Sequence, residues 1–150
     1  MNTKTDIKVR LLLYRKGHIL LLKQTKKNGG NYSLVGGNID KQEHAIEALV
    51  REAKEEAGII LEPKDLKLAH VLHKRIGKNQ RLTLYFKADK YKGEARSREP
   101  KKFQKAEWCP VQRLPPNTTA TVRHVLKAYR HGRLYSEFSK KGEVSPIDKD

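Results

Sequence analysis

Three glutamates crowd one short segment of a strongly basic chain. Glu52, Glu55 and Glu56 lie within REAKEEAG, whereas the 150-residue sequence has a formal net charge of +16. In a helix, which turns by about 100° per residue, these side chains fall within an arc of roughly 100°. Carboxylates this close repel one another and resist ionisation. A divalent cation would remove the repulsion, because hard cations such as Mg²⁺ prefer oxygen ligands and bind a few carboxylates together with substrate phosphates.

The same segment also has a simpler interpretation. Glutamate-rich helices are common, and Glu47 and Arg51 have the spacing of an ordinary i,i+4 ion pair on a solvated helix face. The segment REAKEEAG alone favours this interpretation. The residues before it reverse the preference, because they add a glycine and a further acid at fixed distances.

Residues 37–59 extend the cluster into a longer spaced motif. Their sequence, GNIDKQEHAIEALVREAKEEAGI, has the order G-x5-E-x7-R-E-U-x-E-E-x-G-U, in which U is an aliphatic residue. This is the Nudix box with every fixed position met, so the chain resembles a Nudix hydrolase of the MutT-like type. Two departures are visible: Ala53 is smaller than the usual U residue, and Val35 precedes the glycine pair where many relatives have a proline.

The resemblance implies an α+β protein with the Nudix fold, a mixed β-sheet sandwiched between α-helices. It implies one Nudix domain at residues 1–138. The polar composition of the last dozen residues predicts a flexible tail at residues 139–150. It also implies chemistry on a nucleoside diphosphate linked to some other group X.

The resemblance further assigns roles to residues of the box. Glu55 and Glu56 would be the main Mg²⁺ ligands, with Mn²⁺ as a substitute ion. Glu52 would be a further ligand or the general base that takes a proton from water, and the carbonyl of Gly37 would add a ligand. Arg51 would orient the carboxylates in the catalytic arrangement.

Two more box residues and one carboxylate outside the box complete the expected site. Glu43 would pair with Arg51 as a structural brace, and Gly58 would end the helix. Many Nudix enzymes use a further carboxylate outside the box. Glu99 in the loop SREPKK is the first candidate, with Glu94 and Glu107 behind it, although each could equally be a solvated acid.

The expected reaction is that of a Mg²⁺-dependent pyrophosphohydrolase acting on a nucleoside triphosphate and releasing a nucleoside monophosphate and pyrophosphate. ADP-ribose, a nucleotide sugar, a dinucleoside polyphosphate and a capped RNA end remain alternative substrates, because the box does not fix substrate choice. A non-catalytic Nudix module that binds a nucleotide or RNA is the alternative class. Such a module is expected to lose box carboxylates, and here all three are present. Dimers are common in the family, so a homodimer is one expectation.

The hydrophobic pattern predicts the elements that would position these residues. Apolar runs at residues 7–14 and 18–25 flank Arg15-Lys16-Gly17 and predict a hairpin. Helical spacing of apolar residues predicts one helix at residues 43–57 and a second at residues 118–130, capped by Asn117 or Thr118. A second antiparallel pair is predicted at residues 66–75 and 81–89, a polar loop at 91–104 and a strand at 106–109.

Composition limits the remaining classes. The excess of 33 Lys and Arg over 17 Asp and Glu attracts polyanions, but the cations are spread along the chain, so nucleic-acid binding is not favoured. Cys109 is the only cysteine, which excludes an internal disulfide. The charged start MNTKTDIKVR and the lack of a long apolar run predict a cytoplasmic protein that does not enter a membrane.

Several other side chains have both a functional and a structural interpretation. His70 and His73 lie three apart on a predicted strand and therefore point to opposite faces, which makes a shared metal site poor. Lys74 is interpreted equally as a phosphate ligand and as a solvated strand-end charge. Trp108 is expected in the core, and base stacking is an alternative for four aromatic residues: Tyr85, Phe86, Phe103 and Trp108.

Overall fold

The computed structural model describes residues 3–140 and contains two β-sheets and two α-helices. The larger sheet has the strand order β5-β1-β7-β6-β9. β1 is parallel to β7 and β6 is parallel to β9, whereas the other neighbours are antiparallel, so the sheet is mixed. Its strands are β1 (Thr5–Leu12), β5 (Gly36–Asn38), β6 (Leu66–Ile76), β7 (Asn79–Ala88) and β9 (Tyr135–Lys140).

The smaller sheet is built around one strand. β3 pairs antiparallel with three other strands, and its longest pairing is with β8. Its strands are β2 (Tyr14–Arg15), β3 (His18–Gln24), β4 (Tyr32–Ser33) and β8 (Phe103–Pro110). Two short 3-10 helices, η1 (Lys26–Asn28) and η2 (Pro63–Asp65), lie in the connections.

The predicted hairpin between residues 7–14 and 18–25 is wrong for most of its length. Only Tyr14 and Arg15 pair with β3, while β1 runs in the larger sheet beside β7. β1 buries side chains on both of its faces, since Leu11 and Leu12 belong to different core clusters. A strand buried on both faces suits the middle of a sheet rather than an exposed hairpin.

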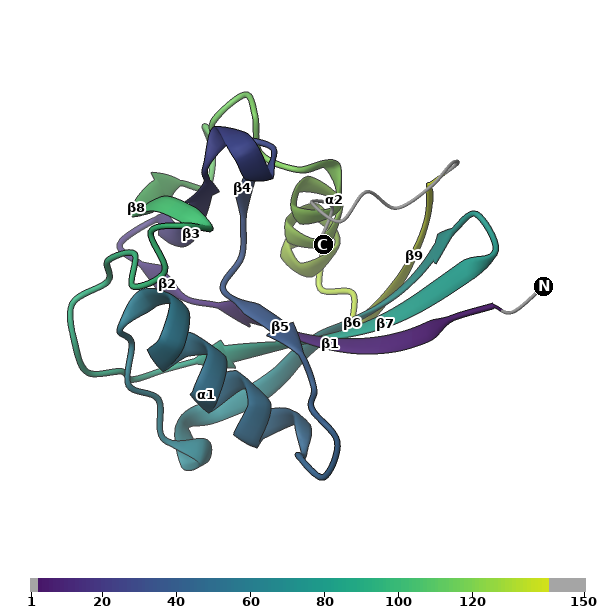
Figure 1. The fold of residues 1–150 in the computed structure, drawn as a ribbon, viewed down its shortest axis with the longest axis horizontal. Coiled ribbons are helices and arrows are strands. Elements are labelled where there is room, and N and C mark those ends of the chain that lie inside the picture. Colours follow the sequence, from purple (N-terminus) through teal and green to yellow (C-terminus); the bar gives the residue numbers. More distant parts are fainter. Residues whose placement is uncertain (1–2, 141–150) are drawn as a thin grey trace.

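The helices α1 (Ala45–Ala57) and α2 (Ala120–Arg130) cover opposite faces of the larger sheet (Figure 1). One core cluster lies under α1 and includes Leu49, and the other lies under α2 and includes Val125. The predicted arrangement of a mixed sheet between helices is therefore confirmed.

Both helices begin two residues later than predicted. At α2 the cap is Thr119, whose hydroxyl accepts a hydrogen bond from the Val122 amide at 3.2 Å. The predicted caps act elsewhere: Asn117 donates to the Gly30 carbonyl at 2.7 Å and Thr118 to the Pro115 carbonyl at 2.8 Å. Those bonds fold the preceding loop and leave the next residue to start the helix.

The antiparallel pair β6–β7 is confirmed, but the sequence did not reveal its third neighbour, β9. β9 continues through Lys140, two residues past the predicted domain boundary, and residues 141–150 of the predicted tail lie outside the described residues. Lys74 is 0% exposed and donates to the Thr121 hydroxyl at 2.8 Å, so its interpretation as a solvated strand-end charge is wrong.

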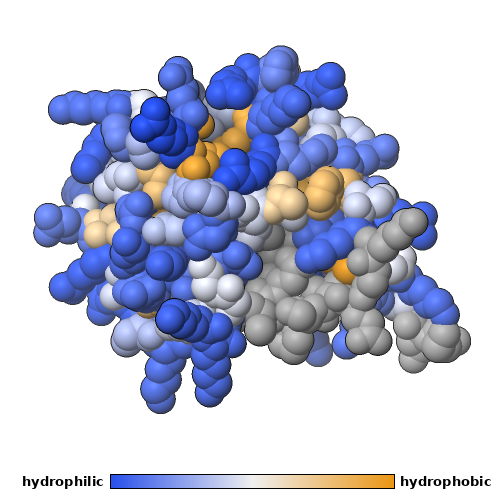
Figure 2. Space-filling view, turned by 90° about the horizontal axis from the view of Figure 1, so that it is seen from above, coloured by the Kyte–Doolittle hydropathy of each residue, from blue (hydrophilic) through white to orange (hydrophobic). Residues whose placement is uncertain are grey.

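The face of the molecule seen from above is mainly hydrophilic. Hydrophobic residues form only small patches on it, between charged and polar ones (Figure 2). Within residues 3–140, the structure contains no helix with the length and apolar character needed to span a membrane.

Candidate active site

α1 brings its three glutamates to the border of the core. Leu49, Ala53 and Ala57 form its fully buried stripe. Glu56, beside that stripe, is only 4% exposed. The side chain of Glu52 is 15% exposed and that of Glu55 is 52% exposed. Exposure to solvent thus increases from Glu56 through Glu52 to Glu55, as expected for acids on the flank of an amphipathic helix.

The glycine pair before α1 lies directly against two of these carboxylates. The Gly36 amide donates to Glu56 Oε1 at 2.9 Å. A Cβ at Gly37 would lie 2.9–3.0 Å from the carboxylate atoms of Glu52, and a Cβ at Gly36 would lie 2.0 Å from the Val9 carbonyl oxygen. Only a backbone without side chains fits between β1 and the acidic face of α1 at this point.

Arg51 joins the acids of the box into one network. Its Nε and Nη2 donate to Glu43 at 2.8 and 3.0 Å, a two-pronged pairing that fixes the guanidinium plane. Its Nη1 donates to Glu52 at 2.8 Å and to Glu55 at 3.3 Å. The hydrogen bond from Arg51 holds the pKa of Glu43 below its ordinary value. Arg51 and Glu43 therefore have the geometry expected of an orienting residue and its brace.

Burial disfavours charge on the two inner carboxylates. Desolvation raises the pKa of Glu56 to about 8, against the opposing effects of Arg10 and of the Gly36 amide. Desolvation also raises the pKa of Glu52, and the hydrogen bond from Arg51 opposes it. Proximity of acids to one another adds to both effects.

Arg10 belongs to the site and was not predicted from the sequence. It is 3% exposed, donates from Nη1 to the Leu34 carbonyl at 3.0 Å and lowers the pKa of Glu56. The available signal was a pair of cations, Lys8 and Arg10, inside the apolar run IKVRLLL, where a buried charge needs a carboxylate or carbonyl partner.

The loop after β7 brings Glu99 to the same place. The Arg98 amide donates to the Glu56 carbonyl at 2.9 Å, which ties this loop to the end of α1. Glu99 and Glu55 line a cavity of about 540 Å³ together with Arg51, Lys54 and Arg98. Glu99 is thus close enough to act with the box carboxylates.

The two reserve candidates lie elsewhere. Glu107 accepts from the Tyr32 hydroxyl at 3.0 Å and pairs with Lys105 at 2.7 Å in the smaller sheet. Glu94 is exposed and does not line the cavity beside Glu55.

The donor set fits a hard divalent cation. Carboxylates of α1, the Gly37 carbonyl and Glu99 supply oxygen atoms alone, which is the ligand type that Mg²⁺ prefers. Within residues 3–140 no three acidic, histidine or cysteine side chains converge on one point. Glu52 turns instead to Arg51, and Glu56 to the Gly36 amide.

The other candidate side chains are mostly structural. Tyr85, Phe86 and Phe103 are 2%, 7% and 5% exposed and belong to the core, which leaves no ring face open for a base. Trp108 is half-buried, and the Arg15 guanidinium lies 4.4 Å from its ring centroid. The imidazole of His70 contacts the Arg133 carbonyl at 2.8 Å and the Ser136 hydroxyl at 2.7 Å.

Comparison with known proteins agrees with the fold and the box. The sequence profile described as "NUDIX domain" matches residues 4–129. The MutT NUDIX hydrolase of Burkholderia pseudomallei has 28% sequence identity and a TM-score of 0.74, with 83% of this chain and 97% of that chain covered. The MutT protein of Bacillus halodurans has 23% identity and a TM-score of 0.74, with 91% and 90% covered.

An ADP-ribose pyrophosphatase of Streptococcus suis shares the fold at 17% identity and a TM-score of 0.61, with 90% of this chain and 98% of that chain covered. No protein with a curated description matches the chain in sequence. Fold and site together define a hydrolase of phosphoric anhydride bonds. The chain belongs to the Nudix family.

Proposed function

We propose that this protein is a Mg²⁺-dependent pyrophosphohydrolase that cleaves a nucleoside triphosphate to a nucleoside monophosphate and pyrophosphate. The observation that carries the proposal is the position of three carboxylates on one helix: Glu52 lies against the Gly37 backbone, Glu56 accepts from the Gly36 amide, and Glu55 lines a cavity together with Glu99. The 28% identity to a MutT NUDIX hydrolase supports a triphosphate over the other members of the substrate class.

In this proposal the metal ligands are Glu52, Glu55, Glu56, Glu99 and the Gly37 carbonyl. A bound Mg²⁺ supplies positive charge that offsets the diphosphate and makes water a better nucleophile near neutral pH. Mn²⁺ can replace it because it accepts the same oxygen ligands.

The remaining roles belong to side chains that hold or move a proton. Glu52 accepts the proton of the attacking water, and burial helps it to do so because a raised pKa makes a carboxylate a stronger base. Arg51 holds the Glu52 and Glu55 carboxylates through hydrogen bonds from its Nη1, and Glu43 holds Arg51 in place. Gly58, in the left-handed conformation at φ 69°, ends α1 directly after these residues.

The test is release of phosphate from a panel of nucleotides, coupled to pyrophosphatase for triphosphates and to phosphatase for other substrates. With Mg²⁺ present we expect turnover of nucleoside triphosphates. The double variant Glu55→Gln/Glu56→Gln should lose more than the roughly 100-fold that removing a partner of a metal ligand typically costs. Glu47→Gln is the matched control, because Glu47 is exposed on the same helix and a glutamine still accepts from the His44 amide.

Two results would contradict the proposal. Turnover that survives in the double variant would mean that the α1 carboxylates do not hold the catalytic ion. A folded protein that binds nucleotide or RNA and turns over no member of the panel would instead be a Nudix binding module.

A further inference from the structure

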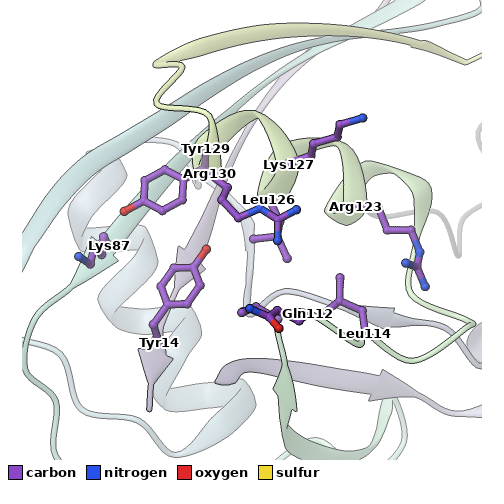
Figure 3. Close-up of a pocket in the computed structure, with 10 residues that line it drawn as sticks. Tyr14, Lys87, Gln112, Leu114, Arg123, Leu126, Lys127, Tyr129 and Arg130 are labelled. Atoms are coloured by element: carbon purple, nitrogen blue, oxygen red, sulfur yellow. The ribbon is translucent and has the colours of Figure 1, made fainter. Parts of the chain in front are cut away.

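A second cavity lies on the other side of the larger sheet from the carboxylates. Its volume is about 580 Å³, within the range of small-molecule sites. Its walls come from α2, from β2 and β7, and from the turn after β8 (Figure 3). Because α1 and α2 cover opposite faces of this sheet, the cavity is separate from the cluster of Glu52, Glu55 and Glu56 (Figure 1).

The lining of this cavity is positively charged. It includes Lys87 from β7 and Arg123, Lys127 and Arg130 from α2, and it contains no acidic residue. The three α2 cations recur at four- and three-residue spacing and so share one side of the helix. Residues 109–134 contain no aspartate or glutamate, so no carboxylate of this segment neutralises them.

The floor of the cavity is apolar and aromatic. Leu126 and Leu114 form part of it, and the rings of Tyr14 and Tyr129 stack at one end with centroids 6.0 Å apart and planes 17° apart. Figure 3 shows Arg130 between the tyrosines and Arg123, which lies at the opposite end. Arg123 is held there by a hydrogen bond to the Pro115 carbonyl at 2.6 Å.

An aromatic end and a cationic end within one cavity match a ligand with a flat ring and an anion. Aromatic side chains bind bases by stacking, and guanidinium groups bind phosphates through paired donors. We propose that this cavity, lined by Tyr14, Tyr129, Arg123 and Arg130, is a second binding site for a nucleotide, either free or as one unit of a single-stranded RNA. The site would bind its ligand without a metal and take no part in hydrolysis.

The first experiment measures binding in EDTA, where the carboxylate site holds no cation, and in the Glu55→Gln/Glu56→Gln background. The probes are AMP and ribose 5-phosphate, followed by calorimetry, and a labelled single-stranded oligoribonucleotide of about eight residues, followed by anisotropy. We expect AMP or the oligonucleotide to bind, and ribose 5-phosphate to bind at least about tenfold more weakly than AMP. Saturable AMP binding assigns the site to a free nucleotide; binding of the oligonucleotide alone assigns it to RNA.

Matched variants separate this site from general charge attraction. Lys127→Gln/Arg130→Gln removes two cations from the cavity, whereas Lys26→Gln/Lys27→Gln removes two exposed cations from η1. We expect the first to weaken binding of the probe by about tenfold or more and the second to leave it nearly unchanged. Tyr129→Leu should reduce the preference for AMP over ribose 5-phosphate. Circular dichroism confirms that each variant is folded.

Three results would overturn the proposal: neither AMP nor the oligonucleotide binds, both double variants weaken binding equally, or ribose 5-phosphate binds as tightly as AMP. The hydrolase proposal is unaffected by these results, because they are obtained without a metal. Conversely, a protein that turns over no nucleotide in the panel assay can still bind AMP or the oligonucleotide in EDTA. Each proposal can therefore fail while the other stands.

Discussion

The two helices pack in the same manner and carry opposite charge. α1 buries Leu49 and Ala53 against one face of the larger sheet, and α2 buries Val122 and Val125 against the other face. Beside the buried stripe, α1 has four glutamates, whereas α2, with the sequence ATVRHVLKAYR, has no acidic residue. The buried stripe determines where each helix lies. In our two proposals, the residues flanking it determine what the helix binds: cations at α1 and anions at α2.

The largest effects should appear where the helices are alike, in their buried stripes. Leu49→Ala should lower the free energy of unfolding by about 2–5 kcal/mol, because the side chain is fully enclosed and leaves a cavity. Leu126→Ala should cost less, because Leu126 already borders an open cavity. Urea denaturation of both variants checks this order. Equal losses would mean that the α2 cavity is closed in solution.

A smaller effect on turnover should follow from Arg51→Lys. Lysine retains the charge but cannot bridge Glu43, Glu52 and Glu55 at once, because it presents a point charge instead of a planar fork. We expect turnover to fall by about 10- to 100-fold with little change in melting temperature. Arg75→Lys, at an exposed position of β6, is the control. A turnover equal to that of the wild type would show that the Arg51 network is structural only.

The smallest expected effect is on the pH dependence of stability, through His124 of α2. Burial, together with His70 and Arg133, lowers the pKa of His124, whose ring contacts the Ser136 hydroxyl at 3.1 Å. A histidine whose folded pKa is depressed stabilises the fold while it is neutral. Its contribution is present above the ordinary histidine pKa of about 6.5 and is lost as the pH falls through the lower folded value.

His124→Gln should therefore flatten this part of the pH profile, because glutamine can still donate to Ser136 and does not titrate. Melting temperatures of both proteins between neutral pH and about pH 5 measure the difference. An identical acid-side decline in wild type and variant would assign the decline to other groups.

The part of the site that lies in one continuous segment could be predicted from the sequence. The box fixes spacing along the chain, and a helix converts that spacing directly into direction, so Glu52, Glu55 and Glu56 lie where the pattern placed them. Glu99 is the first candidate because many Nudix enzymes use a carboxylate outside the box, and the loop that carries it is tied to Glu56 by the backbone hydrogen bond from Arg98.

Features that depend on distant partners could not be predicted. The run containing Leu11 and Leu12 has the same pattern whether it pairs with β3 or with β7, so the hairpin was a reasonable but wrong choice. β9 gains its strand character from pairing with β6 after a short connection from α2. The cations of α2 do not form a cluster in the sequence, because other residues separate Arg123, Lys127 and Arg130. Only the helix brings them to one side.

The decisive measurement for the hydrolase proposal is Mg²⁺-dependent release of pyrophosphate from nucleoside triphosphates by four proteins assayed side by side. These are the wild type, Glu55→Gln/Glu56→Gln on α1, its control Glu47→Gln, and Lys127→Gln/Arg130→Gln on α2. We predict that only the double variant on α1 loses turnover, because in our proposal the metal ligands include the carboxylates of α1 and no residue of α2. Turnover that persists in that variant, or that disappears in the α2 variant, would contradict the assignment of catalysis to α1.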